Sequence, residues 1–301
     1  MNKIGIIGNP LSHTLSPDLH NSAIKHFGLG LSFEKWELKK TELKRFFLNA
    51  KDNNVVGGCI TVPHKENVLK YFDFYDNSVK RIGAANWFKI EDDRILGFNT
   101  DYIGFEKSIP EAILNNLSEL NCVVFGSGGS AKAVVEALSL KNAKNICIIN
   151  RTFTKAKEIA NKYGNFRISS LKLDSIGSVK NELSKADLIV NTTSVGMSSG
   201  PDPDGNLIKG YELKTNVTGI DLVYSPNKTP FFKKINEFGG QAINGIDMLI
   251  YQAQAGFEIL TGENCPFEIM KSKIIQKLIP VVITFNVIIG SEFHLSLINI
   301  P

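Results

Sequence analysis

The chain has 301 residues, of which 43% are hydrophobic and 21% charged, a balance typical of a soluble globular protein with room for two domains. Its net charge of +4 is spread along the chain without a basic tract, which argues against nucleic-acid binding and favours an anionic ligand. Four cysteines lie far apart without metal-ligand spacing, so we expect reduced core cysteines and no metal site. A strand-like run opens the chain with no signal segment before it, and we expect a cytoplasmic protein.

Strand and helix patterns alternate over the first hundred residues, which predicts an α/β domain. Apolar runs typical of strands cover residues 4–7, 31–38 and 58–62. Helices are expected to begin near Pro17 and near Thr41.

Two hydroxyl side chains, Thr14 and Ser16, lie in the loop between the first strand and the first helix. Helix-terminal amides and short hydroxyl donors together can hold a carboxylate. Ordinary capping by Ser16, with Pro17 at the first helical position, explains the pattern equally well. Both interpretations stay open at this point.

Lys65 follows the third strand at its carboxyl end, where α/β sheets collect their ligands. Asn86 and Asp101 flank a predicted hairpin whose turn is residues 91–93. Because a hairpin folds its ends together, we expect the amide and the carboxylate to meet Lys65 in one cleft. Each residue alone has a simpler explanation: a first-turn helix lysine, a turn asparagine and an N-cap aspartate.

Residues 122–155 carry the pattern of a strand-helix-strand unit that binds a dinucleotide. An apolar run at 122–125 leads into GSGGSA, with G-x-G-x-x-A spacing, and a helical pattern and a second apolar run at 146–149 follow. The glycines permit a tight turn and a close approach of backbone amides to a pyrophosphate, and the alanine permits close helix packing. The expected cofactor contacts in this turn are Gly126, Gly128, Gly129, Ser130 and Ala131.

The end of the second strand of this unit distinguishes the two nicotinamide cofactors. NAD sites place an acid there, whereas this chain has Asn150, Arg151 and Thr152, with Lys155 one turn further on. Arg151 can fork onto a 2′-phosphate, Thr152 can donate to it, and Lys155 adds positive charge. The sequence therefore predicts NADP(H), the alternative being a solvated helix face.

Later segments complete this sheet and add helices. Runs at 187–191 and 219–224 are expected to be strands, each followed by a ligand-facing loop, the first of which contains Thr193. A helix at 245–258 is apolar on most sides except at Gln252, which needs a backbone or ligand partner. A further helix is expected at 267–278.

The C-terminal segment at 279–301 is apolar and β-branched. Its run from 278 to 289 is interrupted by Pro280 and Asn286 and is shorter than the roughly 20 apolar residues that a bilayer span needs. We expect an added strand or a loosely packed tail of unknown role and no membrane span, with contact to a membrane surface as the alternative.

Taken together, these motifs resemble the shikimate dehydrogenase family. The matching segments follow the family's order over about residues 3–265: GNPLSHTLSP, ITVPHKE, GAAN, GFNTD, GSGGSAKA, NRT, NTTSVGM, DLVYSPNKTP and NGIDMLIYQA. The resemblance implies a substrate-binding α/β domain at 1–101, completed by helices in 244–278. It also implies a Rossmann NADP-binding domain at 102–243 and an active site in the cleft between the two.

The same resemblance implies an oxidoreductase, a monomer or homodimer, that reversibly reduces 3-dehydroshikimate to shikimate with NADPH, on the chorismate pathway of aromatic amino-acid biosynthesis. The implied catalytic pair is Lys65 with Asp101. The implied substrate contacts are Thr14, Ser16, Thr61, Asn86, Tyr224 and Gln252. Further implied cofactor contacts are Thr193, Gly245 and Met248.

Two positions depart from the family pattern. Thr14 stands where the family usually has Ser, and Trp87 stands beside Asn86 where Thr is usual, so that an indole could reshape the pocket. The alternatives to a strict shikimate enzyme are a quinate/shikimate dehydrogenase that also accepts NAD, and an NADP(H)-binding module without catalysis. Arg151 argues against the first, and the presence of both Lys65 and Asp101 argues against the second.

Overall fold

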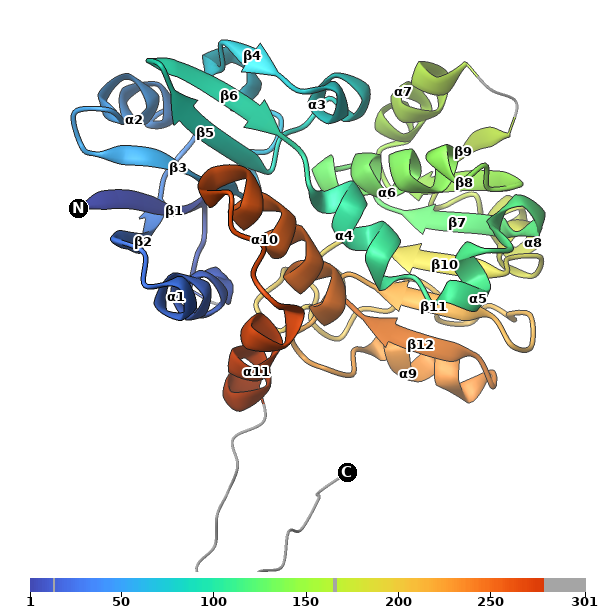
Figure 1. Cartoon of the computed structure of the whole chain (residues 1–301). Helices are drawn as coiled ribbons and strands as arrows, with labels where there is room; N and C mark the ends of the chain where they lie inside the picture. Colours follow the sequence, from blue (N-terminus) through green and yellow to red (C-terminus); the bar gives the residue numbers. More distant parts are fainter. Residues whose placement is uncertain (13, 165–166, 279–301) are drawn as a thin grey trace, which may run out of the picture.

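Two six-stranded sheets, each built from one part of the chain, organise the molecule (Figure 1). The computed structural model describes residues 1–12, 14–164 and 167–278. The predicted α/β class is confirmed. The predictions for the segment 279–301 lie outside the described residues.

The first sheet has the order β2-β1-β3-β5-β6-β4. Its strands β1, β2 and β3 are parallel, whereas β5 is antiparallel to both β3 and β6. On β1, Ile6 packs toward α1, α10 (Ile246–Thr261) and α11 (Phe267–Leu278), and the adjacent Ile7 packs toward α2, as expected for alternating side chains. The elements of this region are β1 (Asn2–Gly8), α1 (Ser16–Phe27), β2 (Leu31–Glu37), α2 (Leu43–Asn49), β3 (Val55–Ile60), η1 (Leu69–Tyr71), β4 (Phe74–Tyr75), α3 (Asn77–Ile82), β5 (Trp87–Glu91) and β6 (Arg94–Phe98).

The predicted hairpin is formed by β5 and β6, with a turn one residue shorter than expected. Glu91 pairs with Arg94 in the last rung, and only Asp92 and Asp93 form the turn. Both have positive φ, 49° and 62°, as a two-residue type I′ turn requires. The other end of the hairpin pairs Trp87 with Phe98, so the residues that flank these two positions are brought together.

The second sheet is parallel throughout, with the order β12-β11-β10-β7-β8-β9. The strand order reverses between β7 and β10, and open α/β sheets bind their ligands at such a switch point. The strands β9 and β12 were not predicted. The elements are β7 (Asn121–Phe125), α6 (Gly129–Leu140), β8 (Asn145–Asn150), α7 (Phe153–Tyr163), β9 (Ile168–Lys172), α8 (Ile176–Leu183), β10 (Leu188–Asn191), β11 (Thr218–Asp221), α9 (Pro230–Glu237) and β12 (Gln241–Asn244).

Two helices, α4 (Asp101–Ser108) and α10 (Ile246–Thr261), lie between the sheets (Figure 1). They cross at Gly104, where an added Cβ would lie 2.7 Å from the carbonyl oxygen of Met248. α10 contributes Met248 to the core of the second sheet, and Ile250 and Phe257 to the core of the first. The remaining elements are α5 (Glu111–Leu114), η2 (Leu117–Glu119) and α11 (Phe267–Leu278).

The predicted domain boundaries fall close to these connections. The boundary between 101 and 102 lies inside α4, and β12 ends at Asn244, one residue beyond the predicted boundary at 243. Helix α11 packs on α1, beside the first sheet. The division into two domains stays a prediction.

A buried carboxylate, Glu136 on α6, forms a second connection between the part of the chain that carries the first sheet and the part that carries the second. It is 2% exposed, and it accepts hydrogen bonds from Arg81 Nε at the end of α3 and from the Tyr163 hydroxyl at 2.9 Å. The bond to Glu136 raises the pKa of Arg81. Because a buried charge needs a partner, Glu136 ties α3 to α6 and α7.

The predicted core cysteines are confirmed, because all four are free and buried. Within the described part of the chain, no helix is long and apolar enough to cross a membrane.

Trp87 occupies a notch in α10 that only glycine leaves open. The indole is fully buried, and a Cβ added at Gly256 would lie 1.9 Å from its Cε2 atom. Any side chain at position 256 must therefore displace the indole.

We predict that Gly256→Ala destabilises the fold. Overpacking costs about 1–3 kcal/mol, which exceeds the roughly 0.5–1 kcal/mol that Ala gains over Gly inside a helix. The matched control is Gly177→Ala on α8, where an added Cβ meets nothing within 4 Å. Denaturant unfolding should show a loss of free energy for the first variant only, and equal effects of the two changes would contradict the packing described here.

Candidate active site

Lys65 and Asp101 form an ion pair at the end of the first sheet. The Lys65 Nζ atom donates to Asp101 Oδ2 at 2.5 Å, and the two side chains are 13% and 5% exposed. Lys65 lies in a loop of turns after β3 and not in the first turn of a helix. Its neighbour His64 is fully buried, with a ring nitrogen 2.7 Å from the Leu38 carbonyl oxygen, which anchors the loop.

Asn86 joins this pair, as expected from the hairpin. Its Nδ2 donates to Asp101 Oδ1 at 2.8 Å and its Oδ1 accepts from the Thr100 backbone N–H at 2.7 Å. The N-cap of α4 is Thr100, and Asp101 is the first helical residue, so the N-cap explanation for Asp101 is wrong. One carboxylate oxygen of Asp101 thus faces Lys65 and the other faces Asn86.

Gln252 on α10 adds a second amide to the cluster. Its Oε1 accepts from Asn86 Nδ2 at 3.1 Å and from the indole Nε1 of Trp87 at 3.4 Å, and its Nε2 donates to the Leu249 carbonyl at 2.8 Å. The expectation that Trp87 could reshape the pocket finds no support, because the indole is buried behind Asn86 in the core that α10 shares with the first sheet.

The hydroxyls of Thr14 and Ser16, at the start of α1, bond to each other. Thr14 Oγ1 donates to Ser16 Oγ at 3.2 Å, and the Ser16 N–H donates to Thr14 Oγ1 at 3.3 Å. The N-cap is Leu15, which makes no side-chain capping bond, so the capping explanation for Ser16 is wrong. Burial raises the pKa of Cys59 to about 12, even though the bond to Ser16 and the charge of Lys65 lower it, and the charge of Asp101 adds to the rise. The hydroxyl pair therefore lies at the same end of the sheet as the ion pair.

Thr61 and Tyr224 come from loops on different halves of the chain. Thr61 directly follows β3 and is half-buried. Tyr224 follows β11, yet it packs against the core cluster of the first sheet, and its burial raises the pKa of its phenol.

The glycine turn after β7 has the shape that a pyrophosphate needs. Gly126 has φ 114°, and a Cβ there would lie 2.3 Å from Thr192 Oγ1, whereas a Cβ at Gly128 would meet nothing within 4 Å. Gly128 is the N-cap of α6 and makes no side-chain capping bond. Ala131 is fully buried between helix and sheet. Open space above helix-terminal amides suits an anion.

This turn also touches the ion pair. Ser130 Oγ accepts from Lys65 Nζ at 3.3 Å, and a Cβ at Gly129 would lie 3.1 Å from the Lys65 side chain. The dinucleotide turn and the lysine after β3 are therefore in direct contact across the two sheets.

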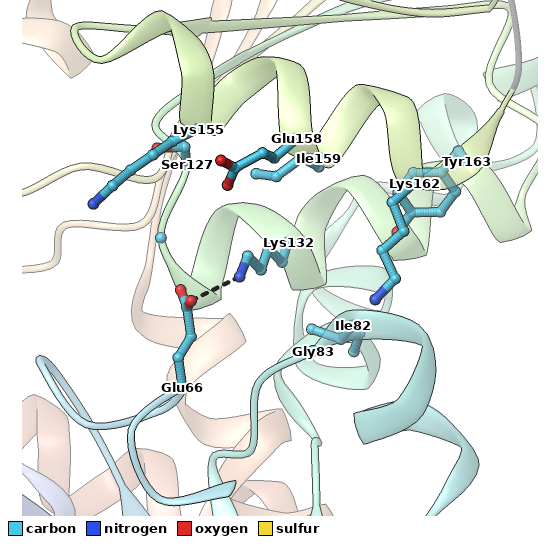
Figure 2. A pocket seen from close by; sticks show the side chains of 11 residues that line it. Glu66, Ile82, Gly83, Ser127, Lys132, Lys155, Glu158, Ile159, Lys162 and Tyr163 are labelled. Carbon is cyan, nitrogen blue, oxygen red and sulfur yellow. Dashed lines mark ion pairs between the residues drawn. The ribbon is translucent and has the colours of Figure 1, made fainter.

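A cavity of about 330 Å³ opens beside the turn, between α6, α7 and the first sheet's loops (Figure 2). Lys132 crosses it to pair with Glu66 at 2.8 Å, and Lys162 points toward Gly83. Burial and the charge of Lys132 lower the pKa of Lys162. Lys155 and Glu158 line it as well.

Four charged residues that line this cavity were not predicted from the sequence as site residues: Glu66, Lys132, Glu158 and Lys162. A signal for part of this set was present, because Lys155, Glu158 and Lys162 follow helical three- and four-residue spacing and share one face of α7. Glu66 and Lys132 offered no such signal, since their pairing joins segments that are remote in sequence.

The residues after β8 lie at the exposed start of α7. Arg151, Thr152 and Lys155 are exposed at the start of α7, and Asn150 Nδ2 donates to the Thr152 carbonyl at 2.9 Å. Positions 150–155 contain no carboxylate. Lys155 lines the cavity, whereas Arg151 lies outside its lining.

Thr193 rests on a polar network at the ends of β10 and β11. Its hydroxyl donates to Asn191 Oδ1 at 2.7 Å, and Asn191 Nδ2 donates to Asp221 Oδ1 at 2.9 Å. Gly245 is the N-cap of α10, where a Cβ would lie 2.2 Å from the Leu222 carbonyl oxygen. Met248 follows it and is 7% exposed. Among the residues that the structure describes, no group of three or more His, Cys, Asp or Glu could hold a metal ion.

Three family models match consecutive parts of the chain. Residues 6–88 match a shikimate dehydrogenase substrate-binding domain, residues 108–197 match shikimate/quinate 5-dehydrogenase, and residues 245–275 match the shikimate 5′-dehydrogenase C-terminal domain. The matches include strands of both sheets and the whole of α10.

Similar proteins extend the likeness to most of the chain. The NADP⁺ shikimate dehydrogenase of Methanococcus aeolicus is 40% identical over 91% of this chain and 96% of its own. A crystal structure of a shikimate dehydrogenase in complex with NADP⁺ has a TM-score of 0.82 at 36% identity, covering 92% of this chain and 96% of the other. The Listeria monocytogenes shikimate 5-dehydrogenase, solved with shikimate and NAD, has a TM-score of 0.82 at 27% identity, covering 91% and 96%.

We predict that Asp221 makes the fold less stable as the pH rises. Burial raises the pKa of Asp221 to about 6, although three donors bond its carboxylate. The folded state therefore keeps the proton up to about pH 6, whereas the unfolded chain releases it at about pH 4. Asp221 therefore contributes about 3 kcal/mol to the free energy of unfolding below about pH 4. This contribution is lost as the pH rises through about 6.

Denaturant unfolding between about pH 4 and about pH 7 checks this linkage. Asp221→Asn should remove this part of the pH dependence, whereas Asp52→Asn, at an exposed turn, should keep it. A parent and an Asp221→Asn variant with parallel pH profiles would contradict the assignment.

Proposed function

Since this chain belongs to the shikimate dehydrogenase family, we propose that it reversibly reduces 3-dehydroshikimate to shikimate with NADPH, in aromatic amino-acid biosynthesis. One observation carries this proposal: the Lys65 ammonium bonds to Asp101 at 2.5 Å and lies 3.3 Å from Ser130 in the dinucleotide turn. A proton donor thus stands beside the place that suits the cofactor. The direct test is an assay of the chain with shikimate and NADP, followed at the absorbance of NADPH.

Lys65 and Asp101 are the proposed acid–base pair. Reduction of a ketone builds negative charge on the carbonyl oxygen, so a donor must stand within hydrogen-bond reach, and the reverse reaction needs the same group as a base. Lys65 donates that proton, and Asp101 holds the ammonium while Asn86 holds Asp101. The nicotinamide cofactor, when bound, supplies and takes back the hydride.

Substrate binding is assigned to polar groups around this pair. The bonded hydroxyls of Thr14 and Ser16 suit a carboxylate without a full countercharge. The hydroxyls of a ring have Asn86 and Gln252 as partners, because Asn86 bonds to Asp101 of the ion pair and Gln252 bonds to Asn86. Further assigned contacts are Thr61 and Tyr224.

Cofactor binding is assigned to the glycine turn and to the residues after β8. The open space above Gly128 and the uncapped start of α6 fit a pyrophosphate. Arg151, Thr152 and Lys155 fit the 2′-phosphate of NADP(H), with no carboxylate at positions 150–155 to oppose it. The other assigned contacts are Gly126, Gly129, Ser130, Ala131, Asn150, Thr193, Gly245 and Met248.

The proposed partners are this substrate and cofactor alone, with neither nucleic acid nor membrane. The spread of the net charge of +4 along the chain supports this choice. We propose a cytoplasmic monomer or homodimer, and four buried, unpaired cysteines are typical of a reducing compartment.

Lys65→Ala should lower kcat for shikimate at least ~10²-fold, because general acid–base help is worth about 10²–10⁴ in rate. Asp101→Asn should do likewise, and the double variant should be little worse than the poorer single one, since the two act as a unit. The matched control is Lys51→Ala, which breaks an exposed ion pair with Asp93 and should leave kcat unchanged. Turnover of Lys65→Ala within about tenfold of the parent, with NADPH affinity intact, would remove Lys65 from the acid–base role.

Arg151→Ala should weaken NADP binding about 10- to 150-fold and NAD binding far less, because a charge-assisted bond to the 2′-phosphate exists only with NADP. Lys157→Ala removes the same charge from an exposed position of α7 outside the cavity lining and serves as the control. Titration with each cofactor measures both constants, and equal weakening of the two by Arg151→Ala would refute the assignment.

A rate comparison of shikimate and quinate, each with NADP and with NAD, separates the strict enzyme from the broader alternative. We expect the pair of shikimate with NADP to be preferred. Comparable rates with quinate or NAD would identify a quinate/shikimate dehydrogenase.

A further inference from the structure

We infer that Trp87 is a positioning residue for substrate recognition: its indole N–H holds the Gln252 amide so that the one remaining N–H of that amide faces the substrate. This inference rests on the proposed function, because it concerns how the protein recognises shikimate. It assigns a role to a fully buried residue.

Gln252 has little freedom left in its hydrogen bonds. Its Oε1 has two acceptor sites, and it accepts from Asn86 Nδ2 at 3.1 Å and from Trp87 Nε1 at 3.4 Å. Its Nε2 carries two hydrogens, one of which goes to the Leu249 carbonyl at 2.8 Å. One N–H remains, so Gln252 recognises an acceptor oxygen, such as that of a ring hydroxyl.

The amide of Asn86 cannot secure this orientation alone. Its Nδ2 carries two hydrogens but has three acceptors: Asp101 Oδ1 at 2.8 Å, Thr100 Oγ1 at 3.1 Å and Gln252 Oε1 at 3.1 Å. The bond to the charged Asp101 is the shortest and strongest of the three. The hydrogen bond from Asn86 to Gln252 is therefore only partly formed. The Trp87 N–H, by contrast, has Gln252 Oε1 as its acceptor.

The indole is held too tightly to release this bond. Trp87 is fully buried and fills the notch at Gly256, where even a Cβ would lie 1.9 Å from it. The ring of His20 packs edge-on against it, with centroids 5.2 Å apart. A buried indole N–H requires an acceptor, and rotating the Gln252 amide would set its NH₂ group against two donors. The two residues therefore fix each other.

The functional consequence is confined to substrate affinity. In the described structure, Trp87 makes no hydrogen bond to Lys65 or Asp101. We therefore expect the proton transfer to be unaffected by Trp87. Loss of its N–H lets the Gln252 amide populate both orientations, of which only one recognises the substrate oxygen.

Trp87→Phe tests this inference, because Phe keeps an aromatic ring but has no N–H. Loss of one neutral hydrogen bond should raise KM for shikimate about 2- to 10-fold, with kcat and the Kd of NADPH unchanged. The matched control is Trp36→Phe, which removes an indole N–H that donates to Glu34 Oε2 at 3.1 Å on β2, away from the site. An unchanged KM in Trp87→Phe would overturn the inference.

A double-mutant cycle shows whether the effect passes through Gln252. In the background Gln252→Ala, the further change Trp87→Phe should leave KM for shikimate where it is. A second rise of similar size would mean that Trp87 acts by another route and would overturn the inference.

A spectroscopic measurement keeps the test valid if Trp87→Phe fails to fold. The chain has two tryptophans, so Trp36→Phe leaves Trp87 as the sole tryptophan reporter. Saturating shikimate should shift its emission, and the shift should disappear in Trp36→Phe/Gln252→Ala. An unchanged emission in Trp36→Phe would overturn the inference.

Activity of the parent protein separates a failure of the proposed function from a failure of the role inferred for Trp87. Absence of shikimate turnover in the unmodified chain would overturn the proposed function and this inference with it. Normal turnover combined with an unchanged KM in Trp87→Phe would overturn the inference alone.

Discussion

The ion pair of Lys65 with Asp101 is the constraint on which the rest of the structure depends. Both side chains are largely withdrawn from solvent, and such charges are tolerable only with close partners and further hydrogen bonds. The fold supplies these partners from distant places: the loop after β3 brings Lys65, the first turn of α4 brings Asp101, and the hairpin of β5 and β6 brings Asn86. Asp101 also benefits from the amides at the start of α4.

The relation between the two sheets follows from helix contacts around this pair. α4 and α10 cross at Gly104 without a side chain between them, and the Thr100 hydroxyl donates to the Gln252 carbonyl at 2.8 Å. On the other side, Glu136 holds Arg81 and Tyr163. These links keep Lys65 against Ser130, so that the proposed proton donor and the glycine turn share one location.

Charge is distributed differently on the two sides of the site. Around Gln252 the polar groups are the Asn86 amide, the Thr100 hydroxyl and the Trp87 indole N–H, with the ion pair of Asp101 and Lys65 beyond Asn86. Around the glycine turn, lysines dominate, and two carboxylates, Glu66 and Glu158, temper them. An anionic cofactor is attracted there without a large excess of positive charge that would need other compensation.

Local patterns in the sequence were sufficient for the α/β class, the glycine turn, the hairpin and helix 267–278, because each depends on neighbouring residues and on strand or helix periodicity. The approach of Asn86 to Asp101 also followed from a local hairpin. Only the tertiary structure decided that Ser16 does not cap α1, that Lys132 reaches Glu66, and that the Trp87 indole donates to Gln252. The last pair lies 165 positions apart, and no local propensity encodes such a contact, since it arises only when α10 packs onto the first sheet.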